Sequence, residues 1–335
     1  MPSRTVRSVS LMLILGVSLT TAYLATGAGD RPTPAFDGAA LYKKLQRACV
    51  KVLVDGHMDG SGCFVDADGL VLTAAHVVKG KAGRIEILSP VMGRLKARPV
   101  AVDLGNDLAL LRVDGGRKPY PWLKIADRMP PPTAPVLLFS SPLWRHDLVL
   151  KGSVARLSPS YCWQPALRCY IRSFYIAGAS PVGSSGGCWV DTRGRVVGVQ
   201  SGYLNNEDKS PVGIAFASPP DAIRKLLATK RSREVATLGG AVEELWTQPP
   251  GFIARLPKGT QGIATAALHK DGPMGKAGLT KETIITAAEG KPVAYLDDLL
   301  SIVRSKKPGD QITLKVIEPI GKPQREVKVR LGKVK

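Results

Sequence analysis

Three short strings of the chain contain side chains that are suited to nucleophilic catalysis. GSGCFVDADGLVLTAAHVV contains His76, NDLALLRV contains Asp107 before an apolar run, and PVGSSGGCWV contains Ser185. A serine hydroxyl is a weak nucleophile at neutral pH, so it needs an adjacent base, and the base needs a carboxylate that orients it. We therefore expect acyl transfer in which Ser185 attacks, His76 moves the proton and Asp107 fixes the tautomer of His76.

The glycines around Ser185 suit a second requirement of acyl transfer, a pair of N–H donors for the developing oxyanion. A Gly-rich turn directs successive backbone N–H groups at one point, and the candidates here are the N–H groups of Gly183 and Ser185. Asp103 and Asp114 compete with Asp107 for the carboxylate role, but only Asp107 has Asn before it and an apolar run after it. Each string alone is typical of ordinary turns; the three in this order predict a catalytic triad.

The segments that must position these residues have the pattern of strands. Residues 50–219 consist of short apolar runs broken by Gly, Pro and Asp, among them VKVLV, LVLTA, DLALLRV and RVVGVQ. This pattern predicts many short strands and no long helix. Short helices are expected at 39–48 and, after two prolines, at 221–227. The result is a mainly β domain over 49–228.

A second unit is expected over 251–335. It follows a polar stretch at 229–250 that ends in Pro-Pro and has the composition of a linker. FIARL, GIATAAL and TIITAA predict strands, and 295–305 predicts a helix with one apolar face. ITLKVIE and EVKVRLG, joined by a turn containing Pro and Gly, predict a closing hairpin. This unit is therefore expected to be a small α/β domain.

At these residues the chain resembles the HtrA (Deg) branch of the chymotrypsin-like serine proteases. The strings around His76, Asp107 and Ser185 and the stretch VGIAFASPPDAI are similar to signatures of that family, and GIATAALHKDGPMGKAGL with DLLSIVRSKKPGDQITLKV resembles its PDZ domain. The resemblance runs from about residue 40 to the C-terminal end. It implies two six-stranded β-barrels with the active site in the cleft between them, followed by a PDZ domain, and no cofactor.

The resemblance also implies a primary specificity pocket and a peptide groove. The implied pocket residues are Ala179, Ser180, Gln200, Ser201 and Tyr203. None of them is acidic, so we expect a preference for small or medium apolar side chains over Lys or Arg. In the PDZ domain, PGFIA is the candidate for the loop that binds a peptide C-terminus before an added strand, with the residues Gly251, Phe252 and Ile253.

The cysteines depart from the family pattern. YCWQPALRCY contains Cys162 and Cys169, the best candidates for a local disulfide, and Cys188 stands where Pro usually follows Ser-Gly-Gly. Cys63 and Cys188 lie in motifs that converge on one site, which leaves their pairing open. Cys49 is expected to be a buried thiol, with an intermolecular bridge as the alternative. No CxxC or HxxxH spacing occurs, so no metal site is expected.

Residues 1–29 have the composition of a targeting segment. Arg4 and Arg7 precede an uncharged stretch at 8–29 whose apolar core, LMLILGVSL, is followed by small residues. A cleaved signal peptide and an N-terminal membrane anchor both fit this pattern, and residues 30–48 then form a linker and a short helix. Both alternatives place the rest of the chain outside the cytoplasmic membrane, periplasmic or secreted, where disulfides persist.

The formal net charge of +20 draws the protein to anionic surfaces without specifying one. No Lys/Arg run with interleaved aromatics and no zinc-finger spacing occurs, so nucleic acid is not an expected partner. The resemblance implies an endopeptidase that acts on unfolded or damaged extracytoplasmic proteins, a PDZ domain that regulates it or recruits substrate, and a homotrimer. Two alternatives stay open: a non-catalytic or latent scaffold that binds protein ligands, and a processing protease with one dedicated substrate.

Overall fold

The computed structural model describes residues 36–80, 83–116, 118–156, 159–206, 208–318 and 323–334. The expected targeting segment at 1–29 lies outside these residues. Among the residues described, no helix is both long and apolar enough to cross a membrane. Asp37–Lys335 group into one compact unit, which contains all the elements described below.

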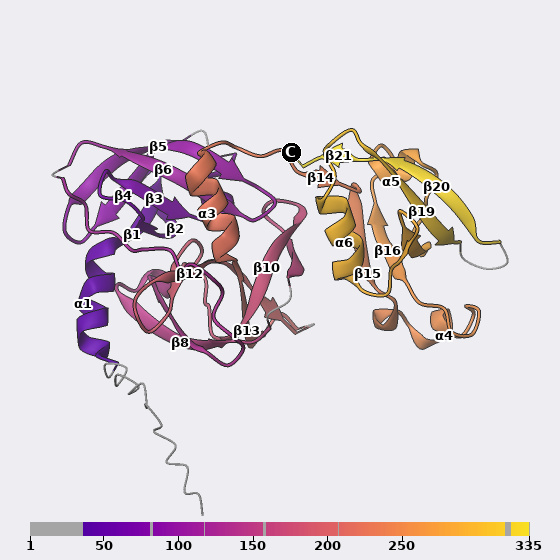
Figure 1. The fold of residues 1–335 in the computed structure, drawn as a ribbon, viewed down its shortest axis with the longest axis horizontal. Coiled ribbons are helices and arrows are strands. Elements are labelled where there is room, and N and C mark those ends of the chain that lie inside the picture. Colours follow the sequence, from indigo (N-terminus) through magenta and orange to yellow (C-terminus); the bar gives the residue numbers. More distant parts are fainter. Residues whose placement is uncertain are drawn as a thin grey trace, which may run out of the picture. The chain divides into compact units, whose positions relative to one another are not determined.

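The first strands close into an antiparallel barrel (Figure 1). The order around the barrel is β1-β2-β3-β6-β5-β4. Fully buried side chains such as Leu70, Leu72 and Leu110 fill its interior, because alternate residues of each strand point inward. The helical turn α2 (Ala75–Val78) directly follows the third strand. The strands are β1 (Cys49–Val54), β2 (His57–Phe64), β3 (Leu70–Thr73), β4 (Ile85–Ser89), β5 (Gly93–Asp103) and β6 (Leu108–Asp114).

A second antiparallel barrel follows in the chain. Its order is β13-β12-β11-β7-β8-β10, and β13 also pairs with β10, which closes the ring; β9 extends the sheet beyond β10. The expectation of two six-stranded barrels is therefore confirmed. The strands are β7 (Pro135–Ser140), β8 (Leu148–Val154), β9 (Ser160–Gln164), β10 (Cys169–Gly178), β11 (Cys188–Val190), β12 (Val196–Asn205) and β13 (Pro211–Ser218).

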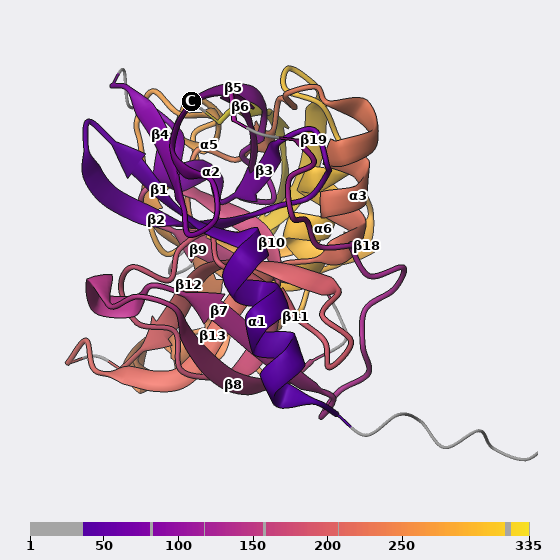
Figure 2. The ribbon, with the colours of Figure 1, turned by 90° about the vertical axis from the view of Figure 1, so that its left-hand side faces the viewer.

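Two helices form where the sequence predicts them. α1 (Gly38–Ala48) is seen in front of the strands in Figure 2. It begins after Asp37, whose carboxylate accepts a hydrogen bond from the N–H of Ala40 at 2.9 Å and so caps the first turn. α3 (Pro220–Thr229) begins with a proline, which is tolerated in the first helical turn because no N–H is needed there.

The last part of the chain forms an antiparallel sheet in the order β15-β16-β17-β19-β20, and β18 pairs with β17. α6 (Leu296–Arg304) packs on this sheet through buried side chains that include Leu299 and Val303. The expected small α/β domain is therefore present. The remaining elements are β14 (Ala236–Thr237), β15 (Gly240–Glu244), η2 (Leu245–Thr247), α4 (Pro250–Ile253), β16 (Ile263–Leu268), α5 (Pro273–Lys276), β17 (Ile284–Ala288), β18 (Lys291–Pro292), β19 (Gln311–Ile317), β20 (Arg325–Arg330) and β21 (Gly332–Lys333).

Two segments near the start of this sheet differ from expectation. β14 and β15 lie within 229–250, so the stretch expected to be a linker contributes an edge strand to the sheet. FIARL was expected to be a strand, and that expectation is wrong, because its first residues belong to the helical turn α4. The N–H of Phe252 donates to the carbonyl of Pro249 at 2.9 Å. Pro250 favours this turn, since its fixed φ suits a helix start.

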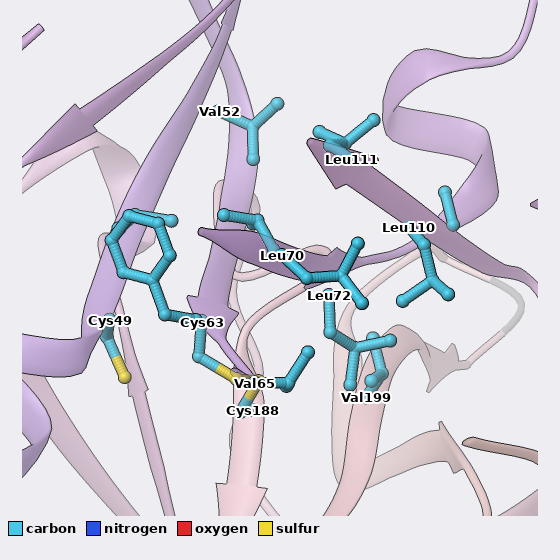
Figure 3. Packing of buried hydrophobic residues seen from close by; sticks show 14 of the residues in the cluster. Cys49, Val52, Cys63, Val65, Leu70, Leu72, Leu110, Leu111, Cys188 and Val199 are labelled. Atoms are coloured by element: carbon cyan, nitrogen blue, oxygen red, sulfur yellow. A yellow bond between two sulfur atoms is a disulfide. The ribbon is translucent and has the colours of Figure 1, made fainter. Parts of the chain in front are cut away.

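One disulfide links the two barrels. Cys63 of β2 and Cys188 of β11 are bonded and fully buried (Figure 3). Cys49 stands opposite Cys63 in the β1–β2 register and is a buried thiol, as expected. Burial raises the pKa of this thiol, so it stays protonated. The sequence analysis leaves the pairing of Cys63 with Cys188 open, and the structure shows that this disulfide forms.

The expected disulfide between Cys162 and Cys169 does not form, because both residues are buried free thiols. They lie on paired strands, but Cys162 is opposite Ile171 and Cys169 is opposite Gln164. Diagonal positions on neighbouring strands are about 7–8 Å apart, beyond the usual Cα separation of a disulfide. The pairing register therefore keeps the two thiols apart.

Candidate active site

His76 and Asp107 meet where the first barrel opens. α2 carries His76 directly after β3, and Asp107 precedes β6, which pairs with β3. The ring Nδ1 of His76 lies 2.7 Å from Oδ2 of Asp107, and the backbone N–H of His76 donates to Oδ1 at 2.9 Å. The hydroxyl of Ser201 donates to Oδ2 at 2.8 Å. Asp107 is fully buried, so these donors replace the water that its carboxylate has lost.

The two competing carboxylates have other partners. Asp103 accepts from the N–H of Gly105 at 3.0 Å and from the amide of Asn106 at 2.8 Å, which shapes the turn before Asp107. Asp114 is exposed and lies 3.7 Å from the guanidinium of Arg98. Neither of these contacts involves His76. The geometry therefore favours Asp107 as its partner.

Ser185 lies in a turn that only glycine can complete. The carbonyl of Ser185 accepts from the N–H of Ser61 at 2.7 Å, which attaches the turn to β2. Gly186 has φ +79°, and a Cβ on it would lie 2.2 Å from Oγ1 of Thr73 and 2.3 Å from the carbonyl of Ser61. A side chain at Gly186 would therefore push Ser185 away from the first barrel. Ser185 is half-buried and, with His76, lines one cleft.

The proposed oxyanion donors belong to the same turn. Gly183 has φ +90°, and its carbonyl accepts from the hydroxyl of Ser61 at 3.1 Å. The N–H of Ser184 donates to the carbonyl of Pro181 at 3.1 Å. Among the described residues, no hydrogen bond occupies the N–H of Gly183 or Ser185. Both N–H groups therefore remain available as donors for an oxyanion.

The cleft beside the candidate triad has a volume of about 550 Å³. Four of the residues expected in the primary pocket line it, namely Ser180, Gln200, Ser201 and Tyr203, and Ala179 does not. The amide of Gln200 is already engaged: its Oε1 accepts from the indole of Trp189 at 2.6 Å and its Nε2 donates to Gly202 at 2.6 Å. None of the described lining residues is acidic, so the cleft offers no carboxylate to a basic side chain.

Aromatic side chains dominate the same cleft, and sequence reasoning missed them. They are Tyr161, Trp163, Tyr170, Tyr175 and Phe216, of which the first four come from the β9–β10 hairpin. The aromatic content of YCWQPALRCY is the signal that could have found them. Their position depends on the hairpin folding back beside β12 and β13, which no local pattern shows.

A thiol in this cleft is not a second nucleophile. Cys162 lines the cleft, and its Sγ lies 3.4 Å from the hydroxyl of Tyr175. Burial raises the pKa of the Cys162 thiol, and burial also raises the pKa of the Tyr175 hydroxyl. Since the thiolate is the nucleophilic form, a thiol that stays protonated is inert. Cys162 therefore does not compete with Ser185 as the candidate nucleophile.

The residues expected in the peptide groove lie elsewhere in the fold. Gly251, Phe252 and Ile253 belong to the helical turn α4, and Phe252 is buried, so they do not form a loop before a strand. That interpretation is wrong. β15 is one of the two edge strands of the sheet, and the residues before it include the buried Leu238 and Gly239 with φ +76°. TLGG at 237–240 holds the hydrophobic-Gly pattern, inside the stretch assigned to a linker.

Two family models match the chain, a trypsin-like peptidase domain over residues 60–199 and a PDZ domain over residues 221–331. A probable periplasmic serine endoprotease DegP-like of Pseudomonas putida (strain W619) is 30% identical over 266 residues, which cover 77% of this chain and 53% of that protein. Serine protease HTRA1 of Xenopus tropicalis is 29% identical over 267 residues, which cover 74% of this chain and 55% of that protein. The chain thus spans about half the length of these relatives.

Solved structures share the fold. The HtrA-type protease AlgW with tripeptide aligns with a TM-score of 0.62 at 21% identity, over 90% of this chain and 97% of that one. The serine endoprotease from Yersinia pestis aligns with a TM-score of 0.56 at 21% identity, over 88% of this chain and 98% of that one. The peptidase match, the PDZ match and these relatives agree. The chain belongs to the HtrA-type family of trypsin-like serine proteases that carry a PDZ domain.

Proposed function

We propose that the protein is a serine endopeptidase whose triad is His76, Asp107 and Ser185. The observation that carries the proposal is the 2.7 Å contact between Nδ1 of His76 and the buried carboxylate of Asp107, with His76 and Ser185 lining one cleft. A histidine held in this way presents its other ring nitrogen as the base. A non-catalytic scaffold does not require this arrangement.

The proposed reaction proceeds by acyl transfer. His76 takes the proton of Ser185 as the hydroxyl attacks the scissile carbonyl, and then gives it to the leaving amine. Asp107 stabilises the imidazolium that forms in between. The N–H groups of Gly183 and Ser185 bind the oxyanion, each contributing about 3 kcal/mol to the transition state. Water then hydrolyses the acyl-enzyme by the same route in reverse.

The cleft supports apolar side chains as the preferred substrate residues on the acyl side. Its aromatic lining offers stacking and dispersion contacts, and its described residues offer no carboxylate to pair with Lys or Arg. Unfolded chains expose such side chains, which supports unfolded or damaged proteins as substrates. The relatives named periplasmic support an extracytoplasmic location for these substrates and for this protein.

The proposed PDZ groove lies between β15 and α6. β15 is an edge strand, and such an edge accepts a peptide as an added strand. In the structure the hydroxyl of Tyr170 donates to the carbonyl of Val242 at 2.6 Å and accepts from the N–H of Val242 at 3.0 Å. A peptide must therefore displace Tyr170 from these two groups. Peptide binding in this groove will be checked by titration of the protein with a labelled peptide. The proposed homotrimer will be checked by the mass of the protein in solution.

The triad is tested with Ser185→Ala. The variant is expected to lose casein cleavage and labelling by a fluorophosphonate, because no hydroxyl is left to be acylated. Ser184→Ala is the matched control, since Ser184 is the buried neighbour whose hydroxyl accepts from Ser140 at 3.2 Å. It is expected to keep both activities. Cleavage of casein by Ser185→Ala at the wild-type rate would reject the proposal.

A further inference from the structure

Three large apolar side chains are exposed beside the turn that carries Ser185. Leu143 is 55% exposed, Trp144 is 50% exposed and Val182 is 52% exposed. Single exposed apolar residues are ordinary on protein surfaces. These three are neighbours, because the N–H of Leu143 donates to the carbonyl of Val182 at 2.7 Å. We call them the 143–144–182 surface.

The backbone holds this surface in an unfavourable conformation. Leu143 has φ +50° and Trp144 has φ +58°, in the left-handed region that disfavours residues with a Cβ. The N–H of Arg145 donates to the carbonyl of Pro142 at 2.9 Å, which closes the turn. Two consecutive bulky residues held here turn apolar side chains toward solvent. Strain of this kind clusters at sites that contact ligands.

The surface continues the catalytic cleft. Val182 belongs to both, since it also lines the cleft with His76 and Ser185. A Cβ on Gly183 would lie 2.7 Å from the carbonyl of Ser141 and 3.2 Å from the nitrogen of Leu143. The loop after β7 therefore lies directly against the residue whose N–H is proposed to bind the oxyanion. A substrate that reaches Ser185 passes close to this loop.

The contacts of Trp144 indicate on which side of the scissile bond the surface lies. The indole N–H of Trp144 donates to the carbonyl of Met58 in β2 at 3.4 Å. β2 belongs to the first barrel, which also carries His76, the group that protonates the leaving amine. The acyl-side pocket is lined instead by β12, on the second barrel. The surface therefore reaches toward the first barrel and away from the β12 wall of the acyl-side pocket, which favours the leaving-group side.

We infer that Leu143, Trp144 and Val182 form a subsite for apolar side chains of the substrate segment that follows the scissile bond. The inference rests on the proposed acyl-transfer function and adds to its specificity. An apolar side chain seated here would cover surface that is otherwise exposed to water. Binding energy from this segment would hold the substrate in register across Ser185.

The test measures how an acyl-enzyme partitions between water and an added amine. The wild-type protein is acylated with a peptide thioester, and Leu-Leu-amide or Gly-Gly-amide is added as the acceptor. Only the leaving-group side contacts the acceptor, so the ratio of the two aminolysis rates reports on this subsite alone. Trp144→Ala is expected to lower the preference for Leu-Leu-amide about tenfold.

Leu143→Asn is a second variant, because Asn tolerates positive φ and keeps the backbone while removing the apolar side chain. It is expected to lower the same preference. Trp122→Ala is the matched control, since Trp122 is 47% exposed and does not line the cleft. If Trp144→Ala and Leu143→Asn both form the acyl-enzyme and the ratio of the two aminolysis rates is unchanged, the subsite is overturned and the acyl-transfer proposal stands. Failure of the wild-type protein to be acylated overturns both proposals.

Discussion

His76 and Asp107 are joined twice, once through the ring and once through the backbone. Nδ1 of His76 lies 2.7 Å from Oδ2, and the N–H of His76 donates to Oδ1 at 2.9 Å. Both carboxylate oxygens of Asp107 therefore hold the same residue. The second bond fixes the start of α2, so the carboxylate sets the backbone position of the histidine as well as its tautomer.

Asp107→Asn tests this double contact. The amide keeps the shape of the carboxylate, but one of its two oxygens is replaced by an NH₂ group, which cannot accept a hydrogen bond. His76 therefore loses either the acceptor for its ring N–H, which fixes its tautomer, or the acceptor for its backbone N–H. kcat is expected to fall about 10⁴-fold, with KM little changed. Steady-state kinetics on a peptide substrate measure both constants. A variant with kcat within tenfold of wild type would show that Asp107 does not orient the base.

Ser201 acts on the same carboxylate. Its hydroxyl donates to Oδ2 of Asp107 at 2.8 Å, so Ser201→Ala removes one donor from a buried anion. kcat is expected to fall about tenfold, since a hydrogen bond to a charged group is lost. KM should stay constant if Ser201 positions Asp107, and should rise if it contacts substrate. Ser201→Thr keeps the hydroxyl and should restore kcat; failure of this rescue counts against a positioning role.

The Cys63–Cys188 disulfide is expected to stabilise the junction of the barrels. The double variant Cys63→Ala/Cys188→Ala should lose about 2–5 kcal/mol of unfolding free energy, measured by urea denaturation. Dithiothreitol should lower the stability of the wild type and leave that of the double variant unchanged. Thiol titration of the unfolded, unreduced wild type should detect Cys49, Cys162 and Cys169. A titration that finds all five thiols would contradict the pairing.

Tyr170 is expected to compete with peptides for β15. Tyr170→Phe removes the two hydrogen bonds to Val242 and keeps the ring, so a labelled peptide with an apolar C-terminus should bind about fivefold more tightly. Fluorescence anisotropy measures this affinity. Tyr42→Phe is the control, because its hydroxyl donates elsewhere, to the carbonyl of Asp147 at 3.1 Å. Equal affinity in wild type and Tyr170→Phe would place the ligand elsewhere.

The parts of the site that local chemistry dictates could be predicted from the sequence. The turn around Ser185 needs glycine because the hydroxyl of Thr73 and the carbonyl of Ser61 crowd Gly186, and the carbonyl of Ser141 crowds Gly183. The strand patterns follow from alternating burial. Turns and strands depend on a few neighbouring residues, so a short string contains the information, whereas the two barrels were expected from the family resemblance.

The remaining features depend on how distant segments pair. Cys63 and Cys188 are separated by 125 positions, and only the barrel junction brings them together. The aromatic lining of the cleft depends on the register of the β9–β10 hairpin. The sequence predicts a linker at β15 because this segment is short and polar, whereas the hydrogen bonds that define the strand come from its partner β16.

The central claim is that Ser185 is the nucleophile. The most direct measurement is mass spectrometry of peptides from wild-type protein that has reacted with a fluorophosphonate. The account predicts one phosphonylated site, Ser185, and no adduct when His76 is replaced by Ala. An adduct on another residue, or unmodified Ser185 in protein that cleaves casein, would contradict it.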